Sequence, residues 1–293
     1  MKPLLKRLVG ALGQPSKNQD PFLEFAPPGH FYSPIPDVAA IDQRQQEWRE
    51  PSGVDLNVEG QRRLLAELAA FYPEMPFPET PSSGGRFSFT QDYYRYSDAI
   101  YFYSLLRHLR PKRVVEVGSG HSSAAALDTD ERFLGGAVSF TFIEPYADRL
   151  KSVLKSGELT RCDLIEQPVQ AAPLAVFEAL QANDILFIDS SHVSKVGSDV
   201  NHLMFNVLPR LRPGVVIHIH DVFFPFEYPE SWLRQGRAWN EAYIVRAFLQ
   251  NNRDYEIILF ASFAGKEFRS FLADRMPLCL KDTGSSIWIR KLR

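Results

Sequence analysis

Two short stretches of the chain place acids and histidines directly after runs of apolar residues. The first is D-I-L-F-I-D-S-S-H, residues 184–192, and the second is V-V-I-H-I-H-D, residues 215–221. Apolar runs of this length are typical of strands buried on both faces. If the two strands are neighbours in a parallel sheet, the residues that follow them meet at one edge. Carboxylates and imidazoles gathered there can bind a metal ion or transfer a proton.

The acids at these two strand ends are Asp189 and Asp221. Two carboxylates that face one pocket repel each other, and a divalent cation is the usual way to keep both ionised. Oxygen ligands favour magnesium, calcium or manganese over zinc, so magnesium is the expected ion. The alternative is that Asp189 caps a helix or accepts backbone hydrogen bonds, and that Asp221 pairs with a basic side chain.

Histidines near these acids are candidates for proton transfer. His192 follows Asp189 by three residues, on the loop that leaves the strand. A neutral imidazole at this position can take a proton from a substrate hydroxyl, unless the residue simply faces solvent. His218 and His220 alternate onto one side of their strand. They are either core histidines with satisfied hydrogen bonds or, for His220, a second candidate base.

A glycine turn marks the expected cofactor site. The stretch E-V-G-S-G-H-S-S-A places Gly118 and Gly120 between a strand and a helix, where glycine lets a ligand approach the backbone without a Cβ clash. Glu144 ends the next strand and can accept hydrogen bonds from two ribose hydroxyls. Without Glu144, the turn would indicate only a tight connection. A nicotinamide dinucleotide usually requires a third glycine or alanine where this chain has Ser123.

The elements that position these residues begin after Pro111, where short apolar runs alternate with helical stretches. This alternation predicts a parallel sheet covered by helices on both faces. Strands are expected at residues 113–117, 138–143, 162–166, 184–189 and 214–220. Helices are expected between them at residues 122–129, 146–154, 174–180 and 196–208. A further helix at 240–249 precedes two closing strands, at 255–260 and 285–290.

The first 110 residues are expected to form a separate N-terminal part. Residues 1–13 are amphipathic and basic, so they either dock as a helix or contact an anionic membrane surface peripherally. The proline-rich stretch that follows contains F-Y-S-P-I-P-D, residues 31–37, which predicts an extended arm. Helices are expected at 61–72 and 96–109. The predicted domain boundary therefore lies between residues 110 and 111.

Composition and charge exclude several classes of protein. With 293 residues, 45% hydrophobic and 23% charged, the chain is typical of soluble globular proteins. A net charge of -2 gives no reason to expect a nucleic-acid partner. The two cysteines, Cys162 and Cys279, form no disulfide framework or zinc motif, which favours the cytoplasm. No apolar run approaches the roughly 18 residues of a membrane span.

In this order, E-V-G-S-G-H-S, I-E-P-Y, D-I-L-F-I-D-S-S-H and I-H-I-H-D resemble the motifs of class I S-adenosylmethionine-dependent methyltransferases, over residues 111–293. The resemblance implies a Rossmann-like, doubly wound, mostly parallel seven-stranded sheet with a reversed last strand. It also implies that S-adenosylmethionine is the cofactor. The residues that it assigns to the cofactor are Glu116, Gly118 and Gly120 at the methionine end, Ser122 in place of the third glycine, Glu144 at the ribose, Gln167 near the adenine, and Asp189.

Within this class, the acid-terminated fourth and fifth strands are similar to bacterial sugar O-methyltransferases of the macrocin type. That similarity implies that Asp189 and Asp221 are metal ligands and that His192, at the D-x-x-H spacing, is the base. F-Y-S-P-I-P-D and R-A-W-N-E-A-Y, residues 237–243, resemble bacterial methyltransferases associated with surface glycans. The expected acceptor is therefore a hydroxyl of a sugar or surface-glycan precursor.

The aromatic stretch after Asp221 is expected either to contact a sugar or to pack as a lid. Its candidate substrate contacts are Glu227, Arg234, Arg237, Asn240 and Glu241. Two other functions remain open: a nicotinamide-dependent oxidoreductase, or a non-catalytic methyltransferase-fold protein in a glycan assembly complex. A homo-oligomer is compatible with each of them.

Overall fold

The computed structural model describes residues 25–40 and 50–293. The described residues fall into two units: a smaller one of residues 25–40 with 230–238, and a larger one of residues 50–229 with 239–293. The amphipathic segment predicted at residues 1–13 lies outside the described residues. Within the described residues, no helix has both the length and the apolar character needed to cross a membrane.

A seven-stranded sheet forms the centre of the larger unit. Its strands are β1 (Arg113–Val117), β2 (Ser139–Ile143), β3 (Asp163–Ile165), β4 (Ile185–Ile188), β5 (Val216–Ile219), β6 (Tyr255–Phe260) and β7 (Ile287–Lys291). They are ordered β3-β2-β1-β4-β5-β7-β6. The first five strands are parallel, whereas β7 runs antiparallel to both β5 and β6. The predicted Rossmann-like sheet with a reversed last strand is confirmed.

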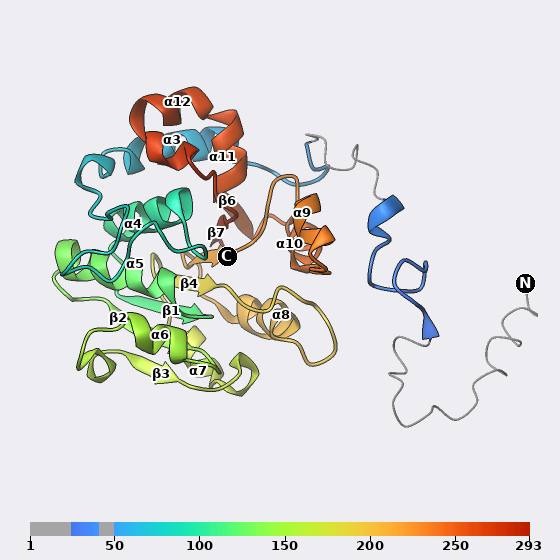
Figure 1. Cartoon of the computed structure of the whole chain (residues 1–293), viewed down its shortest axis with the longest axis horizontal. Helices are drawn as coiled ribbons and strands as arrows, with labels where there is room; N and C mark the ends of the chain where they lie inside the picture. The colour runs from blue at the N-terminus through green and yellow to red at the C-terminus, as the bar shows by residue number, and fades with distance from the viewer. Residues whose placement is uncertain (1–24, 41–49) are drawn as a thin grey trace, which may run out of the picture. The chain divides into compact units, whose positions relative to one another are not determined.

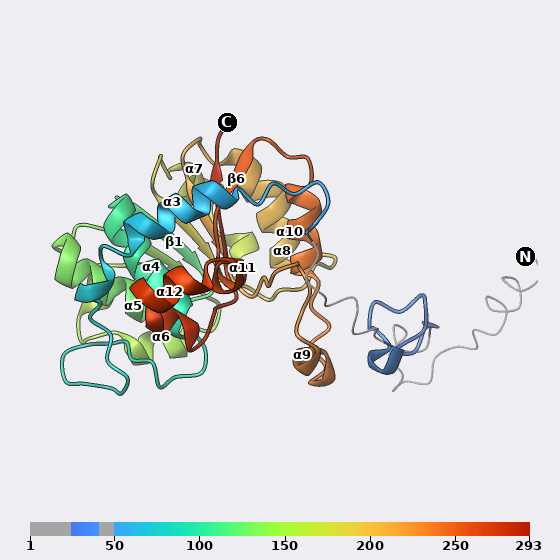
Figure 2. The same ribbon diagram turned by 90° about the horizontal axis from the view of Figure 1, so that it is seen from above.

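Helices cover both faces of this sheet, which explains why most residues of its strands are apolar. Figure 2 shows α4 (Tyr96–Leu109) and α5 (His121–Thr129) on one face, and α8 (Asp199–His202) and α10 (Glu241–Leu249) on the other. Two further crossover helices, α6 (Asp148–Val153) and α7 (Leu174–Glu178), connect the strands toward the β3 edge. Every residue of β4 and β5 is buried.

The strand register brings the candidate residues to one edge of the sheet. Val117, the last residue of β1, pairs with Ile143 and Ile188, the last residues of β2 and β4. Strands β4 and β5 also end together, because Ile188 pairs with Ile219. The polar residues that follow these four strands therefore emerge at the same edge: Gly118, Glu144, Asp189, His220 and Asp221.

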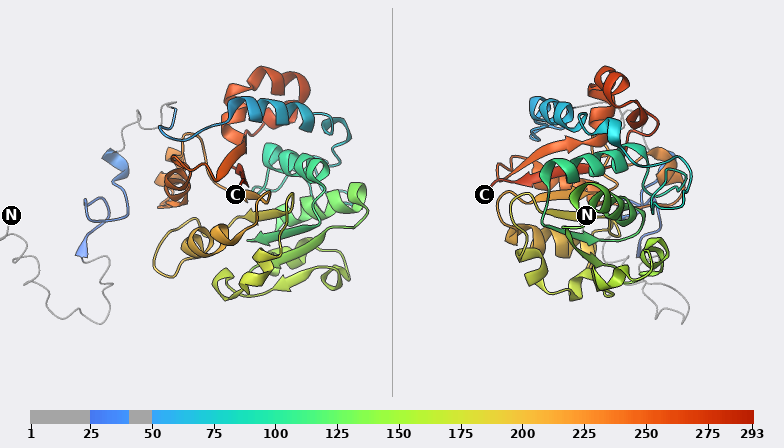
Figure 3. Two further views of the ribbon diagram at one scale, coloured as in Figure 1. Left: turned by 180° about the vertical axis from the view of Figure 1, so that it is seen from behind. Right: turned by 90° about the vertical axis from the view of Figure 1, so that its left-hand side faces the viewer.

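A layer of helices near β6 was not predicted. Between β6 and β7 the chain forms α11 (Ala261–Glu267) and α12 (Arg269–Arg275). They lie beside α3 (Val58–Leu68), as Figures 1 and 3 show. The guanidinium of Arg62 on α3 stands 4.9 Å from the ring centre of Phe268, between α11 and α12. The N-terminal helices α3 and α4 thus belong to the same compact unit as the sheet. The boundary after residue 110 stays a prediction.

Two local predictions differ from the structure. The helix expected at 196–208 begins only at Asp199, because Ser198 caps it by accepting the N–H of Asn201. Residues 31–37, expected to be extended, form part of a tight loop closed by a 3.0 Å hydrogen bond from the Gly29 N–H to the carbonyl of Ile35. A short 3-10 helix, η1 (Val38–Ala40), follows this loop.

Candidate active site

Gly118 makes the turn after β1 and packs directly on the neighbouring strand end. Its φ of +81° lies in the left-handed region that favours glycine, and a Cβ here would lie 1.7 Å from the carbonyl oxygen of Asp189. The Gly118 N–H donates to Ile143 at 3.0 Å, and the Asp189 N–H donates to Val117 at 2.8 Å. Both the conformation and the space therefore require glycine at this position.

Gly120 is less tightly constrained. Its φ of 170° lies outside the left-handed region, and its N–H donates to Ser123 Oγ at 2.9 Å. A Cβ here would meet only the aliphatic chain of Arg149, at 2.8 Å. The Arg149 guanidinium in turn lies 4.2 Å from the ring centre of Tyr93, which stacks on His121. These three side chains cover the glycine turn, and only His121 belongs to the stretch E-V-G-S-G-H-S-S-A itself.

Two cavities adjoin the glycine turn. The larger has a volume of about 410 Å³ and the smaller about 70 Å³, and both are lined by Gly118, Glu144 and Asp189. The region predicted for adenine reaches the larger cavity through Pro168, Val169 and Gln170. Gln167 itself is exposed and does not line either cavity. The region predicted for adenine therefore lies at a cavity, and Gln170 is the glutamine that lines it.

Backbone hydrogen bonds orient the Glu144 carboxylate, which lines both cavities. One carboxylate oxygen accepts the Ser119 N–H at 3.1 Å, and the other accepts the Tyr146 N–H at 2.8 Å. Each oxygen keeps a second lone pair, because a carboxylate offers about four acceptor sites. Glu144 can therefore bind two hydroxyls without giving up the contacts that orient it.

Glu116 lies beneath the turn and lines neither cavity. It is fully buried and accepts hydrogen bonds from the hydroxyls of Ser122 and Ser123, in the first turn of α5. Burial raises the pKa of Glu116 to about 8, although the two serine hydrogen bonds oppose the shift. The hydrogen bond between Ser122 and Glu116 thus joins the start of α5 to β1. Both residues were predicted to contact the cofactor, but of the two only Ser122 lines the smaller cavity.

The raised pKa of Glu116 predicts how stability depends on pH. An unfolded glutamate ionises near its ordinary pKa of 4.5, whereas folded Glu116 ionises near 8. Between these values the folded state binds more protons, so wild-type stability falls as pH rises. We expect Glu116→Gln to escape this loss and to gain about 1–3 kcal/mol relative to wild type between about pH 5 and about pH 9. Urea unfolding at both pH values measures the difference, and a difference that is independent of pH would contradict the prediction.

The ring of His192 lies between the two strand-end acids. Its Nε2 is 3.3 Å from Asp189 Oδ1 and 3.5 Å from Asp221 Oδ2. The His192 side chain is only 6% exposed, so it is not a solvent-facing loop residue. Burial lowers the pKa of His192, but the carboxylates of Asp189 and Glu241 outweigh burial and hold it well above the ordinary range. The structure thus brings together the three residues that the two opening stretches suggested.

A third carboxylate completes the surroundings of His192. Glu241, the first residue of α10, places Oε2 2.9 Å from Nδ1 of His192, and its side chain is 2% exposed. Burial raises the pKa of Glu241, although the hydrogen bond from His192 opposes the shift. Sequence analysis placed Glu241 among the substrate contacts, but in the structure it faces His192. The two residues are 49 positions apart, so local spacing gives no signal of the pair.

The two histidines of β5 have different surroundings. His218 is fully buried and stacks on Phe187, with ring centres 3.8 Å apart, and burial holds its pKa well below the ordinary range. His220 Nε2 lies 3.7 Å from Asp221 Oδ1, and no described residue hydrogen-bonds to His220 Nδ1. His218 is therefore a core residue, whereas His220 faces the acids. Asp221 Oδ1 also accepts the Ser285 hydroxyl at 2.9 Å.

Asp189, His220 and Asp221 fit a divalent cation. One ligand atom from each residue lies within 4.8 Å of the other two. Two carboxylates and one imidazole suit a divalent ion with mixed oxygen and nitrogen ligands. Both predicted acidic ligands belong to this group. His220, expected in the core or as a second base, adds a nitrogen donor.

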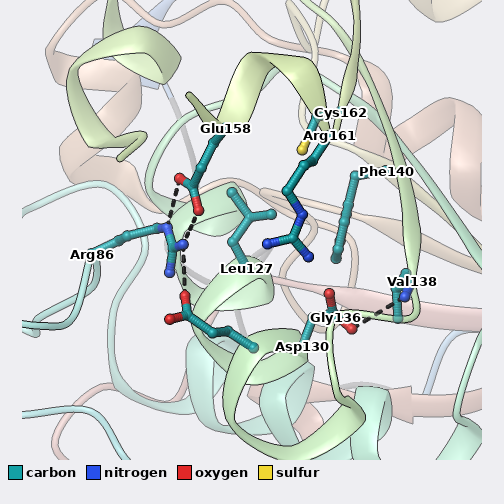
Figure 4. Close-up of a pocket in the computed structure, with 10 residues that line it drawn as sticks. Arg86, Leu127, Asp130, Gly136, Val138, Phe140, Glu158, Arg161 and Cys162 are labelled. Carbon is teal, nitrogen blue, oxygen red and sulfur yellow. Dashed lines mark hydrogen bonds and ion pairs between the residues drawn. The ribbon is translucent and has the colours of Figure 1, made fainter. Parts of the chain in front are cut away.

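A different pocket is lined by Arg86, Glu158 and Cys162, among other residues (Figure 4). Arg86 crosses it and pairs with Asp128 at 2.6 Å, Glu131 at 2.8 Å and Glu158. Burial opposes the charge on Arg86, but its hydrogen bonds to the three carboxylates raise its pKa. Cys162 also lines this pocket, and burial raises the pKa of its thiol to about 11, so it is a poor nucleophile. The ion pairs of Arg86 therefore hold the segment that precedes Tyr93 against the rest of the larger unit.

The fold and the cavity residues together define the class I methyltransferase architecture, with a glycine turn after β1 and an acid after β2. Residues 115–222 match the family model described as a methyltransferase domain. A relative from Archaeoglobus fulgidus, described as an uncharacterized protein, is 34% identical over 169 residues, which cover 54% of this chain and 75% of the relative. The chain therefore belongs to the S-adenosylmethionine-dependent methyltransferases of class I.

Solved structures of methyltransferases resemble the chain more distantly. The methyltransferase PaMTH1 of Podospora anserina, bound to S-adenosylhomocysteine, is 14% identical with a TM-score of 0.43, and the match covers 82% of this chain and 98% of PaMTH1. The O-methyltransferase TomG of Streptomyces achromogenes, in complex with S-adenosylmethionine, is 13% identical with a TM-score of 0.42, and the match covers 82% of this chain and 92% of TomG.

Proposed function

We propose that this methyltransferase transfers the methyl group of S-adenosylmethionine to a hydroxyl of a sugar or surface-glycan precursor. The observation that carries the proposal is the position of His192 Nε2 between Asp189 and Asp221. Asp189 also lines both cavities beside Gly118 and Glu144. A base, a pair of acids and the cofactor pocket therefore share one edge of the sheet, as methyl transfer to a weakly acidic hydroxyl requires.

The protein side of the reaction is an in-line displacement. The acceptor oxygen forms a bond to the methyl carbon while the bond from that carbon to sulfur breaks, and His192 Nε2 takes the hydroxyl proton. Glu144 holds the ribose, and the backbone at Gly118 and Gly120 leaves room for the rest of the cofactor. Most of the rate enhancement would come from this alignment of oxygen, carbon and sulfur.

Asp189, Asp221 and His220 would hold a divalent metal, expected to be magnesium. A divalent ion bound there supplies positive charge, which offsets the acids around His192 and lowers the pKa of the acceptor hydroxyl. His220 and His192 then have separate roles, because His220 donates a ring nitrogen to the ion and His192 remains the base. We therefore propose His192 as the base and His220 as a metal ligand.

Aromatic residues beside His192 support a sugar as the acceptor. The ring centre of Trp239 lies 4.5 Å from that of His192, and Tyr228 packs edge-on against Trp239 at 6.1 Å. Flat aromatic faces suit the C–H faces of sugar rings. One predicted contact, Asn240, is engaged within the protein: its Oδ1 accepts the Ser194 N–H at 2.6 Å.

Calorimetry tests the cofactor assignment, and a screen tests the acceptor. S-adenosylhomocysteine should bind the full chain, whereas NAD should not; binding of NAD alone would favour the oxidoreductase. Nucleotide sugars and surface-glycan fragments are then incubated with a labelled methyl donor and Mg²⁺. Transfer of label to a sugar hydroxyl supports the proposal. Binding of S-adenosylhomocysteine without transfer to any sugar would favour another acceptor or a non-catalytic role.

Asp221→Asn should strongly weaken binding of a divalent ion while S-adenosylhomocysteine still binds. Asp221 has a φ of +55°, and asparagine tolerates this conformation and keeps an acceptor for the Ser285 hydroxyl. The substitution therefore removes the charge but little else. Calorimetric titration with Mn²⁺ should show at least about a tenfold loss of affinity. Asp282→Asn, the same change outside the cluster, is the control. Equal Mn²⁺ affinity in both variants would remove Asp221 from the site.

A further inference from the structure

We infer that Glu241 is a positioning residue that sets the orientation of His192 and presents its Nε2 to the acceptor. The inference rests on the proposed function for the role of His192 as a base. It begins from one contact, the 2.9 Å hydrogen bond between Glu241 Oε2 and His192 Nδ1. The other ring nitrogen faces Asp189 and Asp221. One side of the imidazole is thus held by the protein, and the other side points to the reacting groups.

The start of α10 holds the backbone of His192 as well as its ring. The carbonyl of His192 accepts the N–H groups of Asn240 and Glu241, at 3.1 and 3.2 Å. His192 itself has a φ of +60°, a conformation that a histidine adopts only when its surroundings impose it. The same two residues therefore fix the strained backbone, and Glu241 also fixes the side chain. This double contact makes α10 the support of the proposed base.

Burying the Glu241 carboxylate costs free energy, which indicates that the residue has a specific role. Its side chain is 2% exposed, and within residues 25–40 and 50–293 its only hydrogen-bond or ion-pair partner is His192. Burying a carboxylate with a single partner stabilises a fold weakly at best. A carboxylate on Nδ1 does, however, select the ring orientation and the tautomer in which Nε2 can accept a proton. Positioning explains the contact better than stability does.

The direct test reads the hydrogen bond by NMR, without any acceptor. The full chain, labelled with ¹⁵N-histidine, is studied with Mg²⁺ and S-adenosylhomocysteine. A proton that bridges Nδ1 and a carboxylate resonates far downfield, and His192→Ala assigns the signal by removing it. We expect Glu241→Gln to move the signal strongly upfield, because a neutral amide is a weaker acceptor. Glu227→Gln is the matched control, since Glu227 accepts the Tyr243 hydroxyl instead, and it should leave the signal in place.

The outcomes separate this inference from the proposed function. An unchanged signal in Glu241→Gln overturns the inference. If that variant does not fold, Glu241→Asp decides, since its shorter carboxylate should shift the signal and an unchanged signal again overturns the inference.

With an acceptor from the screen, Glu241→Gln should lower kcat about 10- to 100-fold with little change in KM. It should cause no further loss in a His192→Ala background. If His192→Ala keeps full activity while Glu241→Gln moves the signal, the proposed base fails but Glu241 still orients the ring.

Discussion

Gly118→Ala should abolish binding of S-adenosylhomocysteine and destabilise the fold by about 2–4 kcal/mol. A Cβ on Gly118 would stand 1.7 Å from the Asp189 carbonyl oxygen, and its φ of +81° strains any other residue. The obstructing atom belongs to the backbone at the end of β4, so no side chain can move aside. The shift that relieves the clash would displace Asp189 from the cavity. Calorimetry with S-adenosylhomocysteine and urea unfolding measure the two losses.

Gly120→Ala is the matched control for this substitution. The added methyl would approach only the flexible chain of Arg149, at 2.8 Å, and the φ of 170° lies outside the left-handed region. We expect a loss of stability below about 1 kcal/mol and only a small change in affinity for S-adenosylhomocysteine. If Gly118→Ala and Gly120→Ala lost similar amounts of stability and of affinity for S-adenosylhomocysteine, the contact between Gly118 and Asp189 would not explain why glycine is required.

The sheet could be predicted from the sequence because its strands are short apolar runs that end at polar residues. Every predicted strand is present, and the predicted reversal lies at β7. The differences occur where local patterns are weak or tertiary contacts decide. Helices α11 and α12 fill a connection to which no element had been assigned. The arm at residues 31–37 follows hydrogen bonds across its loop instead of the extended preference of its prolines.

The candidate site was predictable to the extent that its residues lie at strand ends. Gly118, Glu144 and Asp189 all reach the cavities because parallel strands end at one edge. Residues from distant segments were missed because only the fold brings them near. Tyr93 and Arg149 stack on each other beside the glycine turn. Their sequence signals, an aromatic run before α4 and a basic residue after β2, are common and indicate no site by themselves.

His192→Ala should lower kcat for methyl transfer by roughly 10² to 10⁴ while leaving the affinity for S-adenosylhomocysteine nearly unchanged. The substitution removes the only ring nitrogen that lies within 3.5 Å of both strand-end acids among the described residues. It leaves Glu144 and the glycine turn untouched, so the cofactor should still bind. Steady-state kinetics with the acceptor from the screen, together with calorimetry, separate a loss of chemistry from a loss of binding.

His108→Ala is the control for this variant, because His108 lies in the last turn of α4 and pairs only loosely with Glu67, at 3.6 Å. It should retain full kcat. A loss below about threefold in His192→Ala would shift the role of base to His220, whose Nε2 lies 3.7 Å from Asp221. In that case His220→Ala should lower kcat without weakening Mn²⁺ binding. If His220 is instead a metal ligand, its removal should weaken Mn²⁺ binding, so titration of this one variant with Mn²⁺ distinguishes the two roles.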